Sequence, residues 1–240
     1  MHIDPRAEAP VRRLRDRWRL GWGRLPRRTP LSEGAAFWLA TRIALAVFTV
    51  VAVVLMDPEA RDPGYVVHPL SLITRWGNWD GAWYTGIARG GYNPIATAFF
   101  PLFPLLIKLF GSFAGAVLGG IPTLAPLTWL IGGLLASNLS LLVGFVAIAA
   151  LARHELGQSG DAWRALALTA AFPFAFFLTA VYPQATFLAT AGLTLLFART
   201  GRWLAAAAAG YLAGLTHQTT VILILPLAWE FLAQHGWLHL

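Results

Sequence analysis

Apolar runs long enough to cross a lipid bilayer recur along this chain, and they constrain its fold more than any other feature. The first run covers residues 35–56, and about 20 apolar residues are enough to span the hydrocarbon core of a membrane. Only 12% of the residues are charged, whereas a soluble domain carries about 25%. A soluble domain is therefore excluded, and we expect an all-α integral membrane protein.

Six spans are expected in total, which makes the fold a polytopic transmembrane helical bundle. Polar or turn-forming pieces separate the later apolar segments, which are 127–151, 165–181, 185–198, 203–215 and 219–232. Hydropathy alone also allows 203–232 to form one helix, and the polar cluster 216–220 favours the division. We therefore divide the chain into a basic tail, 1–34, and a single membrane domain, 35–240.

The basic tail sets the expected orientation. Residues 1–34 hold nine Arg against four acidic residues, a net +5 of the chain's +7. Trp18 and Trp22 among these arginines could suggest nucleic-acid binding, but a basic flank before a first span more often lies in the cytoplasm. We expect no nucleic-acid partner. The run 35–56 is too long for a signal-peptide core and is retained as a span.

Alternation of the spans then places 57–126 and 182–184 outside, and 152–164 and 199–202 inside. This assignment requires that 98–118 does not cross the membrane. We predict a helix over 98–110 that lies in the outer interface, with Phe99, Phe100, Phe103 and Phe110 facing acyl chains or the lipid tail of a donor. The long outer loop thus carries short interfacial helices.

Charged and aromatic residues are concentrated between Asp57 and Ala98, in the outer loop. Sugars have apolar ring faces and polar edges, so aromatic walls beside a carboxylate suit a sugar-transfer site. The carboxylate is Asp80, and the aromatic residues around it are Trp76, Trp79, Trp83 and Tyr84. Trp and Tyr also gather at membrane interfaces without any catalytic role, and that interpretation stays open.

Three segments carry a resemblance to a known family. They are RWGNWDGAWYTGIARGGYNP (75–94) followed by AFFPLFPLL (98–106), then FPFAFFLTAVYPQATF (172–187), and AGLTHQTTVILILPL (213–227). The first resembles the signature of the PIG-V type GPI mannosyltransferases and their bacterial relatives, which are GT-C membrane glycosyltransferases. The other two resemble weaker patterns of the same family. The resemblance covers the chain from about Arg42 onward and implies a GT-C-like bundle.

The chain also departs from the family pattern. Pro183 and Gln184 stand where the family usually has Ser-Glu, and His217 stands where it usually has Arg. Family members also continue through further spans past the position of Leu240. A divergent specificity, a partial chain and a non-catalytic scaffold or subunit that kept the fold all fit these departures.

The resemblance implies transfer of a sugar, mannose in the family, from a polyprenyl-phosphate donor to a lipid-linked or protein acceptor at the outer membrane face. An acceptor hydroxyl needs a base within hydrogen-bond reach, and Asp80 matches the family's Trp-Asp position. Asp80 could instead cap the helix that follows it. Asp57 is the competing carboxylate, although a solvated turn explains it as well.

Further residues are expected to bind substrate. Arg42 lies within the first span, where its charge needs a partner such as a phosphate or a structural salt bridge, unless it snorkels to the interface. Arg75, Arg89 and His217 could contact the donor phosphate. The full expected set is Arg42, Asp57, Arg75, Trp79, Trp83, Tyr84, Arg89, Tyr92, Tyr182, Gln184 and His217.

Cofactor chemistry is sparse in the sequence. No cysteine is present, and neither zinc-binding motifs nor nucleotide-binding glycine fingerprints occur. We expect no bound zinc, although Asp57, Asp62 and Asp80 could supply oxygen ligands to a divalent cation. A small-solute transporter is a third hypothesis, but only Arg42 is deeply placed. The expected location is the plasma membrane of a bacterium, in contact with membrane lipids.

Overall fold

The chain is helical throughout the described residues. A computed structural model describes residues 29–56, 69–157 and 160–235, and every regular element in these ranges is a helix, which confirms the all-α prediction there. The longer helices are α2 (Pro30–Met56), α5 (Leu102–Leu118), α6 (Thr128–Leu156), α7 (Asp161–Ala171), α8 (Gln184–Arg199), α9 (Trp203–Gly214) and α10 (Ile224–Gln234). The shorter elements are α3 (Pro69–Thr74), α4 (Asp80–Gly90) and the 3₁₀ turns η2 (Arg75–Gly77), η3 (Ala96–Ala98), η4 (Ala125–Leu127), η5 (Ala175–Leu178) and η6 (Gln218–Leu223).

Two helices are long and apolar enough to cross a membrane. They cover Pro30–Leu55 and Ala125–Leu156, the second including the turn η4. The first leaves large apolar side chains exposed, including Val47, Val54 and Leu55. Water would oppose so large an exposed apolar face, whereas lipid chains would not.

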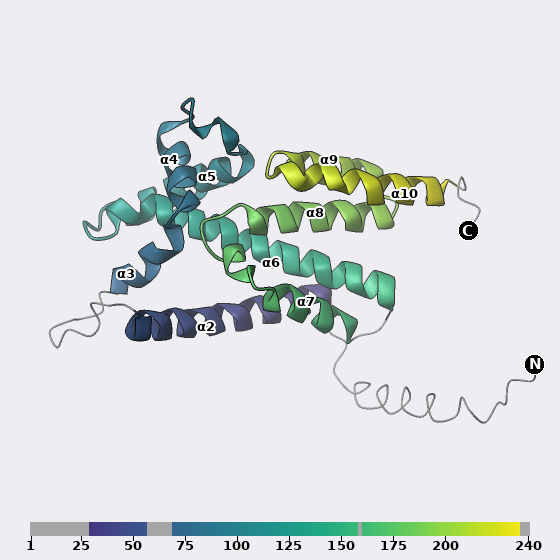
Figure 1. Ribbon diagram of the computed structural model, residues 1–240, viewed down its shortest axis with the longest axis horizontal. Coiled ribbons are helices and arrows are strands. Elements are labelled where there is room, and N and C mark those ends of the chain that lie inside the picture. The colour runs from purple at the N-terminus through teal and green to yellow at the C-terminus, as the bar shows by residue number, and fades with distance from the viewer. Residues whose placement is uncertain (1–28, 57–68, 158–159, 236–240) are drawn as a thin grey trace, which may run out of the picture.

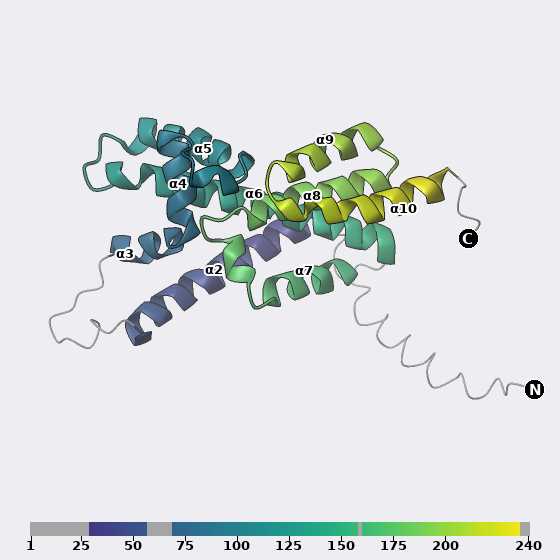
Figure 2. The same cartoon turned by 45° about the horizontal axis from the view of Figure 1, so that its top comes forward.

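Helix α6 is the central element of the fold. It contacts α2, α5, α7 and α8, and these helices lie around it in both views (Figures 1 and 2). Two buried clusters flank it. One contains Tyr84, Phe103, Ile107, Ala136 and Val181, and the other contains Leu141, Phe145, Ala149, Ala162, Leu166 and Ala185. Because α6 contributes to both clusters, it joins the helices on either side into one core.

Helix α5 differs from the interfacial helix predicted over 98–110. It runs from Leu102 to Leu118 and packs along the first part of α6. Phe103 is fully buried, so the prediction that it faces acyl chains was wrong. The helical period carries Phe103 and Ile107 to the side of α6. The exposed stripe is formed by Leu105, Leu109, Phe113 and Val117.

The predicted span 165–181 is broken. Helix α7 ends at Ala171, and Phe172 already has an extended backbone (φ −60°, ψ 134°). Pro173 explains this, because a proline disfavours the helical conformation in the residue before it. The chain then passes through η5 to Thr179, and residues 179–183 lie at the end of the bundle that carries α4.

An ionic cluster joins the helices at the opposite end of the bundle. Arg153 contacts both carboxylate oxygens of Glu33 at 2.7 Å, and the Glu33 side chain is almost fully buried. Arg199 binds Glu155 through two contacts of 2.5 and 2.6 Å and also pairs with Glu230. These pairs bring together the first turn of α2 and the last turns of α6, α8 and α10 (Figure 1).

Close contact between α5 and α6 depends on Gly132. A Cβ atom added there would lie 2.6 Å from the Gly111 Cα atom and 2.9 Å from the Ile107 carbonyl oxygen. We predict that Gly132→Ala lowers the free energy of unfolding in detergent by about 1–3 kcal/mol, the usual cost of overpacking. Gly115→Ala in α5 is the matched control, because its Cβ would meet open space. Since alanine favours the helix over glycine, this variant should raise the free energy of unfolding by about 0.5–1 kcal/mol. Equal effects of the two variants would contradict the close approach.

Candidate functional site

A bent, non-helical segment, residues 180–182, anchors the candidate site to α6. The Ser137 hydroxyl donates to the Ala180 carbonyl oxygen at 2.7 Å, and the Val181 amide donates to the Trp76 carbonyl oxygen at 2.9 Å. The Val181 side chain is fully buried against Gly133, where an added Cβ would lie 2.5 Å from Val181 Cγ1. The segment is therefore fixed between α6 and the turn that precedes α4.

Asp80 begins α4 and follows a strained residue. Trp79 has φ 55° and ψ −123°, a conformation that non-glycine residues adopt only at a cost of about 1–3 kcal/mol. Trp79 is the N-cap residue and makes no side-chain cap, so the structure does not place Asp80 in the capping position that the sequence left open. The Asp80 carboxylate is exposed, and its backbone amide donates to the Tyr182 hydroxyl at 3.2 Å.

A cavity of about 490 Å³ adjoins this turn. One wall is the apolar face of α2, and the opposite wall carries the polar groups of Arg75, Asn78 and Tyr182. The lining residues are Leu45, Phe48, Thr49, Ala52, Val53, Arg75, Trp76, Asn78, Trp79, Phe176, Ala180 and Tyr182. Asp80 follows the lining residue Trp79 directly. We call this space the α2 cavity.

Three residues of the expected set therefore meet at the α2 cavity: Arg75, Trp79 and Tyr182. Three other lining residues were not predicted. Phe48 and Thr49 lie in an apolar span with no motif, and Phe176 lies in the quoted segment 172–187 but was not singled out. Only the tertiary packing of α2 against the 172–182 segment reveals them.

Four other residues of the expected set, which lie in or just after α4, do not line the α2 cavity. Tyr84 is buried, with its ring 5.0 Å from that of Phe99 and 5.1 Å from that of Phe103, so its expected place in a sugar-facing wall is corrected to the core. Burial, with the nearby Asp80 charge, raises the pKa of Tyr84 above its ordinary value. Trp83 is partly exposed and stacks on Phe99. Tyr92 donates to the Phe99 carbonyl oxygen at 3.0 Å, and Arg89 is exposed in the last turn of α4.

Gln184 and His217 lie outside the α2 cavity as well. Gln184 lines a second space, of about 740 Å³, between α7, the 172–178 segment and α8. Its Oε1 atom is buried and has no hydrogen-bond partner in the described part of the chain. His217 caps η6, its Nδ1 accepting from the Thr219 amide at 3.2 Å, and its ring lies 5.6 Å from that of Phe187.

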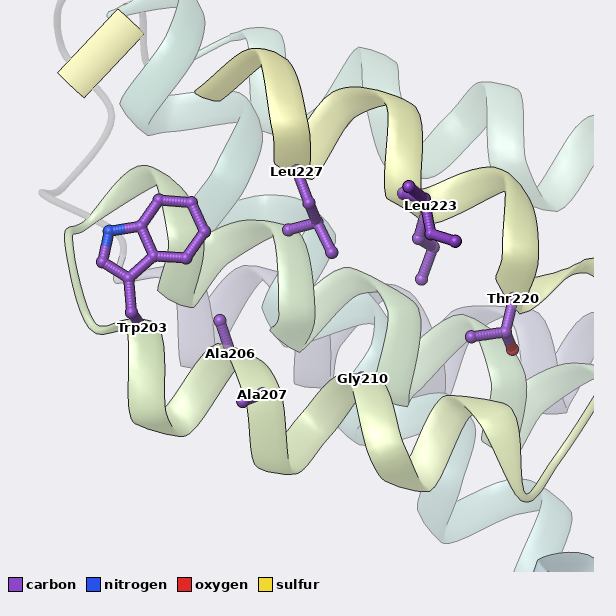
Figure 3. Close-up of a pocket in the computed structure, with 8 residues that line it drawn as sticks. Trp203, Ala206, Ala207, Gly210, Thr220, Leu223 and Leu227 are labelled. Carbon is purple, nitrogen blue, oxygen red and sulfur yellow. The ribbon is translucent and has the colours of Figure 1, made fainter. Parts of the chain in front are cut away.

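A third cavity, of about 340 Å³, separates α9 from η6 and α10 (Figure 3). Ala206, Ala207 and Gly210 leave space on α9, opposite Leu223 and Leu227. Its lining contains no charged residue, so it offers no group for acid–base chemistry.

Arg42 has an amide partner where the sequence allowed a salt bridge or a phosphate. Its Nη1 donates to the Asn138 side-chain oxygen at 2.6 Å, while its Nε atom is buried without a partner among the described residues. Asn138 also accepts, through its backbone oxygen, from the Trp38 indole at 2.8 Å and donates to the Thr179 carbonyl oxygen at 3.3 Å. Arg42 therefore joins α2 to α6 one helical turn from Leu45, a lining residue of the α2 cavity.

Two expected acidic residues, Asp57 and Asp62, lie outside the described residues, as does nearly all of the basic tail. Within residues 29–56, 69–157 and 160–235, no group of three or more His, Asp or Glu side chains could hold a metal ion. Comparison of the chain with protein-family models, curated proteins and solved structures finds no match.

The Arg42 contact can be tested through its partner. We predict that Asn138→Ala lowers the free energy of unfolding by about 2–3 kcal/mol, because it removes a hydrogen bond to a charged group and leaves that group buried. Leu139→Ala, at an exposed neighbouring position, is the control for truncation in α6. Denaturation in detergent micelles would measure both, and a smaller loss for Asn138→Ala than for Leu139→Ala would contradict the role of the contact.

Proposed function

We propose that the protein is a membrane glycosyltransferase that moves a sugar from a polyprenyl-phosphate donor to an acceptor at the outer face of the membrane. The observation that supports this function best is the α2 cavity, whose walls are apolar on one side and polar on the other and whose lining residue Trp79 directly precedes Asp80. Such a cavity suits a ligand that joins a hydrocarbon chain to a polar head.

Each part of the cavity has a role in this proposal. The α2 face around Phe48 and Ala52 receives the isoprenoid chain. Arg75 lies near the phosphate, whose oxygens gain negative charge as the sugar leaves. The indole of Trp79, which is 74% exposed, offers a stacking surface for the sugar ring.

Asp80 acts as the general base. It takes the proton of the acceptor hydroxyl while the acceptor oxygen bonds to the anomeric carbon. The bond from that carbon to the phosphate oxygen breaks, and the lipid phosphate leaves with the electron pair. Displacement from the opposite side inverts the anomeric carbon.

The topology belongs to the same proposal. The helices run alternately in opposite directions in the order α2, α6, α7, α8, α9 and α10 (Figures 1 and 2). This alternation suits six passes through the plasma membrane of a bacterium. The basic tail favours the ionic cluster of Glu33, Arg153, Glu155, Arg199 and Glu230 on the cytoplasmic side. Asp80 then faces outward.

Introduced cysteines can test this topology, because the chain has none. Thr97 and Thr200 are exposed at opposite ends of the bundle. We predict that a membrane-impermeant thiol reagent labels Thr97→Cys in intact cells but labels Thr200→Cys only after the membrane is opened. The reverse pattern would overturn the orientation and the outer location of the site.

Asp80→Asn tests the proposed base. Because general-base catalysis contributes about 10²–10⁴ in rate, we predict that this variant inserts normally and loses sugar transfer by that factor. Transfer of labelled mannose from polyprenyl-phosphate mannose in purified membranes is the measurement. Asp161→Asn is the matched control, since Asp161 also begins an 11-residue helix, at the opposite end of the bundle. Equal rates for Asp80→Asn and Asp161→Asn would eliminate Asp80 as the base.

A non-catalytic scaffold is the second candidate. It is favoured by the replacement of charged residues of the resembled family by Gln184 and His217. Both residues lie away from the α2 cavity. This candidate gains if the unmodified protein transfers no sugar from any polyprenyl-phosphate donor.

A further inference from the structure

A buried phenol bridges the strained turn at Trp79, which the Gly81 amide also closes by donating to the Asn78 carbonyl oxygen at 3.2 Å. The Tyr182 hydroxyl accepts from the Asp80 amide at 3.2 Å and donates to the Asn78 carbonyl oxygen in a long contact of 3.3 Å. These two groups belong to the residues on either side of Trp79. The phenol therefore spans the residue whose backbone is strained.

The phenol itself is held firmly. Tyr182 is 6% exposed, its ring lies 4.7 Å from that of Phe177, and its carbonyl oxygen accepts from the buried Ser137 hydroxyl at 3.3 Å. Burial raises the pKa of Tyr182 above its ordinary value, so the phenol keeps the proton that it donates. We call the two hydrogen bonds of the Tyr182 hydroxyl the phenol bridge. The Tyr182 residue that makes this bridge is fixed by α6 and not by the turn 78–80.

Backbone strain at one exposed residue needs a cause in the surrounding structure. Trp79 is the one non-glycine residue with positive φ among the described residues, and glycine would adopt that conformation without strain. The indole lines the α2 cavity, and the next residue is the exposed Asp80. Strain of this kind persists only where neighbouring groups over-determine the conformation, and it gathers at functional sites.

We propose that Tyr182 is a positioning residue, whose hydroxyl holds the turn 78–80 so that the Trp79 indole faces the α2 cavity and the Asp80 carboxylate stands at its rim. The inference rests on the proposed function for the role of Asp80, but the bridge itself does not. Tyr182 acts through Asp80 and Trp79 and takes no proton from the acceptor.

Tyr182→Phe removes the hydroxyl and keeps the ring. We expect hydrogen exchange at the Asp80 amide, measured at single-residue resolution in detergent, to become about five- to tenfold faster, because one ordinary hydrogen bond is lost. Exchange in the middle of α6 should not change. Tyr211→Phe is the matched control, since Tyr211 is exposed on α9, away from the site. An unchanged Asp80 amide would overturn the proposal.

Transfer kinetics provide the second readout. A displaced base should lower kcat by about tenfold or more while the KM for the donor changes little, because small misplacements slow chemistry more than binding. In a Trp79→Gly background, Tyr182→Phe should change kcat by less than about twofold, since glycine adopts the turn unaided. Faster amide exchange with unchanged kcat would reject the positioning role, and an equal loss of kcat in both backgrounds would reject the strain argument.

The outcomes also separate this inference from the proposed function. If the unmodified protein transfers no sugar while Tyr182→Phe still accelerates exchange at Asp80, the enzyme assignment fails and the bridge stands. If Tyr182→Phe alone does not fold, recovery of folding in the Trp79→Gly background supports the bridge, and failure of both variants overturns it.

Discussion

The hydrogen bonds of residues 180–182 tie the turn that precedes α4 to the central helix α6, and the candidate site depends on them. This short segment receives the Ser137 hydroxyl from α6, donates its Val181 amide to Trp76, and presents the Tyr182 phenol to the turn before α4. Buried backbone groups must find partners, and here the partners come from distant parts of the sequence, since Ser137 lies 43 residues from Ala180 and Asp80 lies 102 residues from Tyr182. Without these bonds, neither the α2 cavity nor the place of Asp80 would be defined.

Much of the helical plan could be predicted, because apolar length and turn residues are local signals. The runs 127–151 and 185–198 correspond to α6 and α8, which extend only slightly beyond them. The break after α7 was missed although Pro173 marks it. The span 165–181 was predicted from its mean hydropathy, which a single proline hardly changes. The side of α5 that packs against α6 was also predicted wrongly, for another reason. An apolar helix can turn any side toward a partner, and only contact with α6 buries Phe103.

The candidate site was predicted in part. The motif around Trp79 and Asp80 is continuous in sequence, so the short helix that follows it could be predicted, whereas the strained turn at Trp79 could not. Tyr182, which the prediction placed on the same face as Asp80, accepts a hydrogen bond from the Asp80 amide. Tyr84 was misplaced, because its burial depends on ring contacts with Phe99 and Phe103 that the sequence does not show. The contribution of α2 to the cavity lining could not be predicted. In sequence, Phe48 and Thr49 resemble the other residues of the span, and only the packing of other segments against α2 sets them apart.

The most direct test of the account is a map of where a polyprenyl-phosphate ligand binds. A photoreactive isoprenoid phosphate, activated with the full chain in nanodiscs and followed by peptide sequencing, would show the contact residues. We expect crosslinks to Phe48 or Thr49 on α2 together with Trp76 or Trp79, suppressed by an excess of unmodified polyprenyl phosphate. Competable crosslinks confined to the cavity between α9 and α10, with none on α2, would contradict the assignment of the site.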